Sequence, residues 1–433
     1  MAVGSLTALC AAVASCGDSG SSNAGGTATT KGGGTSKAPF TTLEVGEGKA
    51  YTTIQNAVDA AKGGELILLS PGVYKEAVVV EKDNLVIRGL DRNKVIIDGE
   101  FTRDNGIKVL ANGVAVENLT ARNHKSNGVF FTGDYDSKVV LDGYRASYVT
   151  VYNNGDYGIY AFNATRGQFD HDYGSGHPDS PYYIGQCNPC NAVVSEVVAE
   201  NNFLGYSGTN STGVSIVNSR FSQNRIGISP QSQDGEKEAP NDGGIIAGNN
   251  VYDNNNPDTP QKDEKLDLAF GTGIVAAGTN NYKIVKNRVV DNKRANIVLI
   301  LWPFGQIFDP HKNEVRDNVT SGAKEYADLV LALADTSGGA LDNCFSGNTF
   351  ETARPAAIEK VAACGSASEK GFEGIDATAL AGGAPPYKDY KTMAPPPDQP
   401  GMPDPATSPP VPADTSWNPI KVELDKIKVP TKV

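Results

Sequence analysis

The densest group of side chains that could do chemistry lies between Ala164 and Tyr183, in the run ATRGQFDHDYGSGHPDSPYY. This run holds two of the four histidines in the chain. Its candidate members are Arg166, Asp170, His171, Asp172, Tyr173, His177 and Asp179. Histidine and tyrosine can exchange protons with a substrate, whereas the three aspartates could hold Ca²⁺, which takes about six to eight oxygen ligands. The run therefore predicts an acid–base site or a calcium site, with a hydrated loop of paired charges as the alternative.

A second group lies in Trp302–Asn313, with the sequence WPFGQIFDPHKN, and contains Asp309 and His311. Its aromatic side chains could pack within a loop, or they could stack on the C–H face of a sugar ring, for which Trp302 is the main candidate. Arg225 is a further cation that could face an acidic ligand. Two insertions rich in Asp, Glu, Lys and Pro, Pro230–Gly243 and Asn254–Phe270, are predicted to be solvated loops that border a groove.

The composition excludes several classes of protein. The chain has 433 residues, a net charge of −12 and no cluster of Lys and Arg, so binding of nucleic acid is not expected. A hydrophobic content of 39% excludes global disorder. No apolar run reaches the roughly 18 residues that a membrane span needs, which excludes a polytopic membrane protein. With 48 Gly and 35 Asn, the chain favours turns.

The N-terminal residues indicate export. Residues 1–15 are predicted to be a signal peptide, because small apolar residues end in Val13-Ala14-Ser15-Cys16. This ending resembles the lipobox of bacterial lipoproteins, which implies that Cys16 carries the lipid anchor. The first basic residue is Lys31, whereas such signals begin with a basic residue, so an ordinary secretory signal is the alternative. Residues 16–40 are predicted to be a flexible tether.

Export would place the remaining cysteines in an oxidising compartment. An even number is left, namely Cys187, Cys190, Cys344 and Cys364. Proximity in sequence predicts the disulfides Cys187–Cys190 and Cys344–Cys364. The C-x-x-C pair could instead bind zinc, but neither a second C-x-x-C nor a nearby His pair is evident. We therefore expect two structural disulfides.

The elements that must position these residues follow a repeat. Ile54, Ala57, Val58 and Ala61 have helical spacing, with Thr52 or Thr53 as N-cap and Gly63-Gly64 as the end. Short apolar strands follow, at Leu66–Leu69, Ala77–Val80, Leu85–Ile87 and Val95–Ile97. A motif of Gly or Asn followed by a β-branched residue then recurs, and so does an apolar residue close to Asn, as in VENLTARN, VVAENN and NVYDNN.

Copies recur at about 22 to 33 residues, the length of one solenoid coil. This pattern resembles the right-handed parallel β-helix of the pectin-lyase-like superfamily, over residues 41–365. A propeller or an antiparallel sandwich fits less well. The segments SPYYIGQCNPCNAVV and LGYSGTN also look like bacterial β-helix proteins that have no assigned reaction. We expect an all-β protein of about eleven coils, whose opening helix caps the first coil. Asn at equivalent turns should hydrogen-bond from coil to coil.

Residues 366–433 form a proline-rich tail, in which proline favours an extended conformation. The tail is expected to be a cell-wall spacer, or else to wrap along the β-helix.

The superfamily includes lyases, hydrolases, epimerases and inert adhesins, so it implies no single activity. Its polysaccharide lyases and C5-epimerases need a cation to neutralise a carboxylate, a base and an acid. By this resemblance Arg166 would neutralise the carboxylate of the substrate, His171 or His177 would be the base, and Tyr173 would be the acid. Asp309-Pro310-His311 looks like the D-P-H of alginate C5-epimerases, so His311 would be catalytic, with Asp309 assisting. Lys312 and Phe308 depart from that family, which has an acidic residue after the histidine and a tyrosine before the motif.

We therefore expect a monomeric, exported protein, lipid-anchored or secreted, that binds an acidic polysaccharide and, if it is an enzyme, acts on it as a lyase or epimerase. Ca²⁺ could be its cofactor. The alternative is a non-enzymatic rod at the cell surface that contacts glycan or cell wall.

Overall fold

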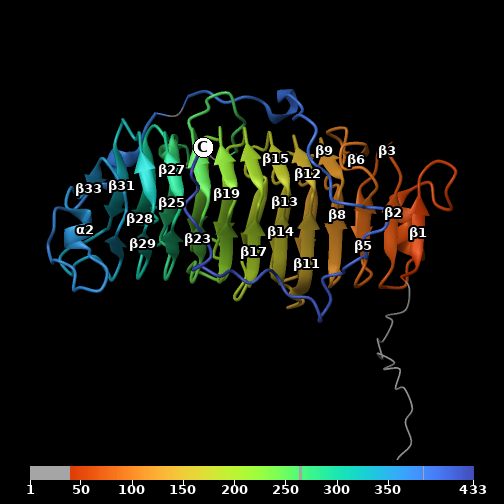
Figure 1. Ribbon diagram of the computed structural model, residues 1–433, viewed down its shortest axis with the longest axis horizontal. Coiled ribbons are helices and arrows are strands. Elements are labelled where there is room, and N and C mark those ends of the chain that lie inside the picture. The colour runs from red at the N-terminus through yellow and green to blue at the C-terminus, as the bar shows by residue number, and fades with distance from the viewer. Residues whose placement is uncertain (1–39, 263–265, 384) are drawn as a thin grey trace, which may run out of the picture. The chain divides into compact units, whose positions relative to one another are not determined.

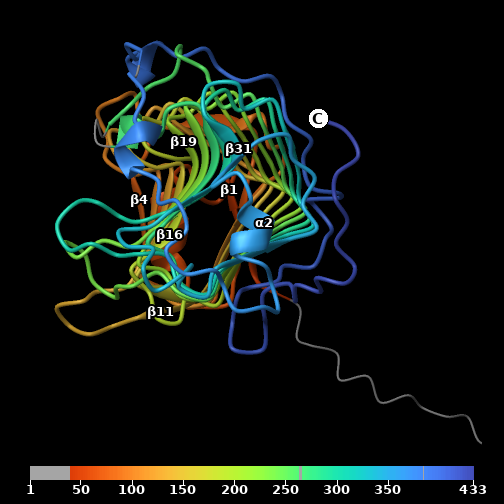
Figure 2. The same ribbon diagram turned by 90° about the vertical axis from the view of Figure 1, so that its left-hand side faces the viewer.

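The computed structural model describes residues 40–262, 266–383 and 385–433. The predicted signal peptide, Cys16 and all of the tether except Phe40 lie outside these residues. The described chain forms three long sheets in which neighbouring strands are parallel (Figures 1 and 2). A typical coil contributes one strand to each of the three sheets. This arrangement is a right-handed parallel β-helix and confirms the predicted fold class.

The three sheets contain 12, 10 and 11 strands within the described ranges. Sheet A contains β1 (Thr42–Val45), β2 (Leu66–Leu69), β5 (Val86–Gly89), β8 (Val114–Glu117), β11 (Leu141–Ser147), β14 (Ala164–Asp170), β17 (Ala192–Ser195), β20 (Val214–Val217), β23 (Ile245–Ala247), β26 (Lys283–Val285), β29 (Glu314–Arg316) and β32 (Cys344–Ser346). Sheet B contains β3 (Gly72–Tyr74), β6 (Val95–Asp98), β9 (Thr120–Arg122), β12 (Thr150–Tyr152), β15 (Tyr173–Ser175), β18 (Val198–Glu200), β21 (Arg220–Ser222), β24 (Asn250–Tyr252), β27 (Arg288–Val290) and β30 (Val319–Ser321). Sheet C contains β4 (Val78–Val80), β7 (Ile107–Val109), β10 (Val129–Thr132), β13 (Ile159–Phe162), β16 (Tyr182–Gly185), β19 (Leu204–Thr209), β22 (Ile226–Gln231), β25 (Thr272–Ala277), β28 (Ala295–Ile300), β31 (Ala327–Ala332) and β33 (Ala353–Arg354).

The side chains on the inward face of each strand fill the interior of the β-helix. Alternate residues of a strand point inward and outward, so β13 buries Ile159 and Ala161 while Tyr160 and Phe162 face out. Inward residues at the same position of successive coils lie in register, as Ile274 pairs with Ile297 and Ile297 with Leu329. This continuous apolar interior explains why the short strands recur with the period of a coil.

The opening helix is where the spacing predicts it. Helix α1 (Ile54–Ala60) has Thr53 as its N-cap, whose side chain accepts a hydrogen bond from the Asn56 backbone N–H. The helix buries Ile54, Ala57 and Val58 against the first coil. The other helical segments are α2 (Ile358–Val361), which packs near β32, and the short 3₁₀ segments η1 (Leu266–Ala269), η2 (Ala377–Leu380) and η3 (Tyr390–Thr392). In the described part of the chain, no helix has the length and apolar character required to cross a membrane.

Asparagine side chains stack through the turns, as predicted. The amide of Asn202 donates to the side-chain oxygen of Asn224 at 2.9 Å, and Asn224 donates in the same way to Asn254. A second stack, beginning at Asn249 and Asn287, follows the turns between sheets A and B. These buried amides satisfy one another and nearby carbonyls, so the coils stay in register at each corner.

The proline-rich tail wraps along the solenoid, which decides between the two expected arrangements. Its backbone carbonyls accept hydrogen bonds from arginines of the coils, namely Arg88, Arg92, Arg166, Arg225 and Arg288. Further on, Val422, Leu424 and Ile427 pack on the outer side of sheet A. Figure 1 shows the tail as the blue trace along the rod. The tail also contacts the outer face of sheet C, through Ile375 and Leu380.

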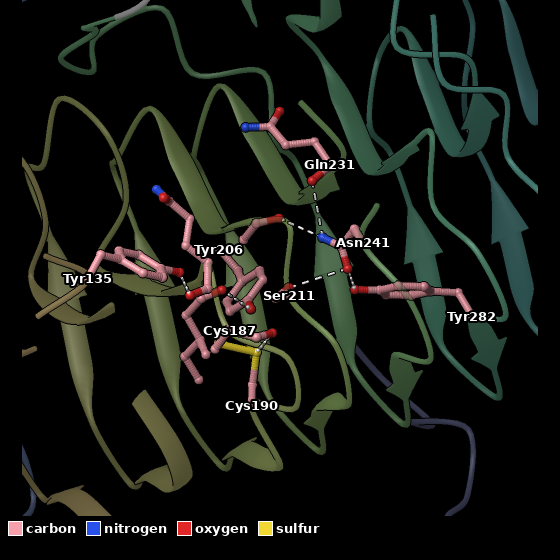
Figure 3. Close-up of a disulfide and its surroundings, with 11 residues drawn as sticks. Tyr135, Cys187, Cys190, Tyr206, Ser211, Gln231, Asn241 and Tyr282 are labelled. Carbon is pink, nitrogen blue, oxygen red and sulfur yellow. Dashed lines mark hydrogen bonds between the residues drawn. A yellow bond between two sulfur atoms is a disulfide. The ribbon is translucent and has the colours of Figure 1, made fainter. Parts of the chain in front are cut away.

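Both predicted disulfides are present. Cys187–Cys190 closes a short loop after β16, and Cys344–Cys364 links β32 to the segment after α2. Figure 3 shows the first disulfide beside a buried polar group, in which Asn241 accepts from Tyr282 at 2.7 Å and from Ser211 at 3.3 Å. This group fills the corner between sheets C and A.

Candidate functional site

Most of the run from Ala164 to Tyr183 lies in strands, so the alternative of a hydrated loop is wrong. The run is a regular coil made of β14, a turn, β15, a second turn and the start of β16. Because one coil passes round the whole rod, its side chains face different sides. Arg166 lies in sheet A, His171 in the turn between sheets A and B, and Tyr173 in sheet B. His177 and Asp179 lie in the following turn. The structure therefore does not bring these predicted residues into one site.

His177 occupies a position in an asparagine stack. Its Nδ1 lies 3.0 Å from the side-chain oxygen of Asn202, and its Nε2 lies 3.2 Å from the amide nitrogen of Asn154. Nδ1 must donate and Nε2 must accept, which requires the neutral ring. The side chain is fully buried, and burial lowers its pKa to about 4. A role as a base in contact with substrate is not supported by this position.

The pKa of His177 predicts a loss of stability in acid. The unfolded chain binds a proton at this histidine below pH 6.5, while the folded chain stays neutral down to about pH 4. The stabilising contribution is therefore complete above pH 6.5 and disappears as the pH falls, by about 3 kcal/mol in total. We expect His177→Asn, which keeps an amide in the stack, to lose less stability than the wild type between pH 7 and pH 4.5. Unfolding by urea at both pH values tests this, and equal losses would contradict it.

Arg166 and Arg225 are held by the tail. Arg166 donates to Asp142 at 2.8 Å and to the carbonyl of Trp417 at 2.6 Å. Arg225 is fully buried, donates to the carbonyl of Pro385 at 2.6 Å and lies over the ring of Phe270. Their positions support attachment of the tail rather than neutralisation of a ligand.

His171 and its neighbours form a small polar group at the turn between sheets A and B. The His171 ring stacks on Tyr148 and lies 3.0 Å from both Asp170 and Glu196. The hydrogen bond to Asp170 raises the pKa of His171. Asp172 is buried, and burial raises the pKa of its carboxyl, while one oxygen accepts from the Val149 N–H at 2.7 Å.

These aspartates do not form a calcium site. Asp170 already accepts hydrogen bonds from Ser147 and Gln168. Across residues 40–262, 266–383 and 385–433, no group of three or more His, Cys, Asp or Glu side chains is placed to hold a metal ion. Tyr173 donates to Glu200 at 3.2 Å on sheet B, where both line a cavity under the tail.

Asp309 and His311 lie in a loop between sheets C and A, far along the rod from His171. Asp309 accepts from the Ala334 N–H at 2.8 Å, and His311 is exposed. The same loop carries Trp302, which is 6% exposed and meets Phe304 edge to face. The catalytic role of Asp309 and His311 stays a prediction.

Sequence reasoning missed a row of aromatic side chains on the outer face of sheet C. Phe130, Tyr160 and Tyr183 occupy the same register position of three successive strands. The rings of Phe130 and Tyr160 stack with their centres 4.6 Å apart, and the ring centres of Tyr160 and Tyr183 are 4.9 Å apart. Tyr157 packs beside Tyr160 and Tyr183, and Phe162 beside Tyr160. We call these five residues the aromatic row.

Cations and protonated hydroxyls border the aromatic row. Lys108 lies 5.9 Å from the centre of the Phe130 ring. Lys237 lies 4.2 Å from the centre of the Tyr135 ring, which meets Phe162 of the row edge to face. Burial raises the pKa of Tyr160 and of Tyr183, so both hydroxyls stay protonated.

On the next strands of sheet C, the residues in register with the aromatic row are polar, and the strands beyond them carry apolar residues. Tyr183 pairs with Ser207, and Ser207 pairs with Ser229. Beyond these serines, sheet C forms the floor of a groove of about 340 Å³ bordered by Trp302, Leu268 and Leu380. Leu268 and Ala269 of the predicted loop Asn254–Phe270 line this groove, whereas Pro230 and Gln231 of the predicted loop Pro230–Gly243 belong to β22.

The chain is similar to solved structures of other proteins, at low sequence identity. The A-module of mannuronan C-5 epimerase AlgE4 from Azotobacter vinelandii aligns at 14% identity and a TM-score of 0.47, over 68% of this chain and 90% of that chain. The AlgE6 A-module from the same organism aligns at 14% identity and a TM-score of 0.48, over 68% and 93%. Alginate lyase from Paenibacillus sp. str. FPU-7 aligns at 14% identity and a TM-score of 0.39, over 73% and 96%. No family model matches the chain, and no curated protein matches it in sequence.

Proposed function

We propose that this protein binds an acidic polysaccharide outside the cytoplasm, with the glycan chain lying across the outer face of sheet C. The observation that carries the proposal is the aromatic row on the outer face of sheet C. Rings next to Ser and Tyr hydroxyls suit sugars, which present both C–H faces and hydroxyl groups. Lys108 and Lys237 beside the rings suit carboxylates on those sugars. Attachment to the membrane through Cys16 is part of the same proposal.

Modification of the bound chain is the second candidate function. It rests on Asp309 and His311, which lie in the loop that also places Trp302 beside the groove. Incubation with uronate polymers would show a lyase by the ultraviolet absorbance of new unsaturated ends, and an epimerase by the altered sugar composition. His311→Ala should abolish either activity and leave binding unchanged.

Replacing Tyr160 by alanine tests the binding face. Tyr160 is the centre of the aromatic row, so its loss should weaken binding of a uronate oligosaccharide about tenfold or more. Calorimetry with neutral and uronate oligosaccharides of equal length measures this and identifies the preferred charge.

Tyr148→Ala is the matched control, because Tyr148 is equally a partly exposed, stacked tyrosine but lies at the turn between sheets A and B. It should leave binding unchanged. The proposal fails if Tyr148→Ala weakens binding and Tyr160→Ala does not.

A further inference from the structure

The groove on sheet C is built from three successive coils. Strands β22, β25 and β28 form its floor, with Val275, Ala277 and Ile300 among the outward side chains. Segment η1 forms one wall, the loop that begins at Trp302 forms another, and η2 of the tail closes it beside Leu380. Its volume of 340 Å³ is within the range of sites that hold small molecules.

The groove is mostly apolar, and its polar lining residues are Ser229, Gln231, Thr272 and Thr378. Its apolar lining includes Ile226, Leu268, Val298, Trp302 and Phe304. A ligand surface matching this lining must be mostly hydrocarbon, because hydroxyl groups placed against these side chains would lose their hydrogen bonds to water.

Gln231 shows that a polar group belongs at the β22 end of the groove. The residue is 4% exposed, and its amide nitrogen donates to the Thr209 hydroxyl at 3.3 Å. Its side-chain oxygen is buried and has no hydrogen-bond partner. An unpaired buried acceptor is costly, and a ligand hydroxyl that donates to it would remove that cost.

The β22 end of the groove is continuous with the aromatic row. Gln231 pairs with Thr209 on one side and with Ala277 on the other, so sheet C changes from polar to apolar between β22 and β25. Ser229 joins through Ser207 to Tyr183 of the aromatic row. Ser229 and Gln231 therefore place this end of the groove on the side of the aromatic row.

We propose that the groove holds the hydrocarbon part of an amphiphilic glycan, an alkyl or acyl chain attached to a sugar whose hydroxyl donates to the side-chain oxygen of Gln231. This inference rests on the proposed function and names the class of glycan. A hydrocarbon without a sugar would leave Gln231 unpaired. A sugar without a hydrocarbon would leave the apolar floor exposed to water.

Alkyl glucosides test the inference. Calorimetry with methyl, butyl, hexyl and octyl glucoside, below the concentrations at which they aggregate, should show affinity rising about fourfold for each added methylene until the groove is filled. Binding of the longer chains should also show a negative heat-capacity change. The inference is overturned if chain length has no effect while unsubstituted uronate oligosaccharides still bind.

Two variants separate the two ends of the ligand. Leu268→Ser alters a wall residue that is 44% exposed, so the fold should persist while the gain in affinity per methylene falls. Gln231→Ala should weaken all glucosides by a similar factor and leave the gain per methylene unchanged. If hexanol binds as tightly as hexyl glucoside, the role of the sugar is refuted.

The outcomes also separate this inference from the proposed function. Binding of octyl glucoside without binding of any oligosaccharide would contradict the polysaccharide proposal and leave the groove as the site. Binding of neither ligand class would contradict both.

Discussion

Replacing Glu117 by alanine should lower the free energy of unfolding by about 3 to 5 kcal/mol. Glu117 is 2% exposed on sheet A, and its side-chain oxygens accept from Arg88 at 2.6 Å and from Arg145. Arg88 is equally buried, because the tail passes over it and accepts its remaining donors. Alanine would leave the guanidinium of Arg88 in the interior without its counter-ion.

A matched exposed pair gives the control for this variant. Glu44→Ala breaks a pair with Lys49 at 3.2 Å on the surface and should cost less than about 1 kcal/mol. The double variant Arg88→Met with Glu117→Leu should recover much of the lost stability, because it removes both charges and fills the volume. Urea unfolding measures all three variants. A Glu117→Ala protein as stable as Glu44→Ala would contradict the buried network.

Ending the chain at Gly383 should lower the free energy of unfolding by about 5 kcal/mol. The deletion removes Val422, Leu424 and Ile427 from the outer side of sheet A and exposes the apolar strip beneath them. It also removes the carbonyls that accept from Arg88 and Arg225. The tail is thus a structural part of the solenoid, although its composition is that of a spacer.

The same deletion should leave binding on sheet C unchanged, because η2, which borders the groove, precedes Gly383. Adding residues 385–433 as a separate peptide should restore part of the lost stability, since the tail contacts the coils at many separate places. A truncated protein as stable as the full chain would show that the tail does not hold the coils.

The fold could be predicted because its cause is local and repeated. Each short strand must bury one face in the same interior, so the sequence repeats its aliphatic residues once per coil. The predicted strand Leu66–Leu69 and the N-cap Thr53 agree with the structure. The asparagine stacks also follow from sequence, because Asn amides at equivalent turns can hydrogen-bond to one another. The left-handed angles belong to neighbouring residues such as Asn201.

The candidate site could not be predicted in the same way. Ionisable residues that are close in sequence, such as Arg166, His171 and His177, belong to one coil and face different sides of the rod. A site on a solenoid instead collects residues about one coil apart, such as Phe130, Tyr160 and Tyr183. Outward positions of sheet C strands, aligned by register, are the signal that would have identified the aromatic row. No pattern in the sequence indicates that His177 takes the place of an asparagine in a stack.

The structure of the protein bound to a uronate oligosaccharide tests the central claim most directly. The account predicts sugar rings over the aromatic row on sheet C, in contact with Tyr160 and continuing toward Ser207. An oligosaccharide seated instead at His171, between sheets A and B, or under the tail beside Tyr173, would contradict it.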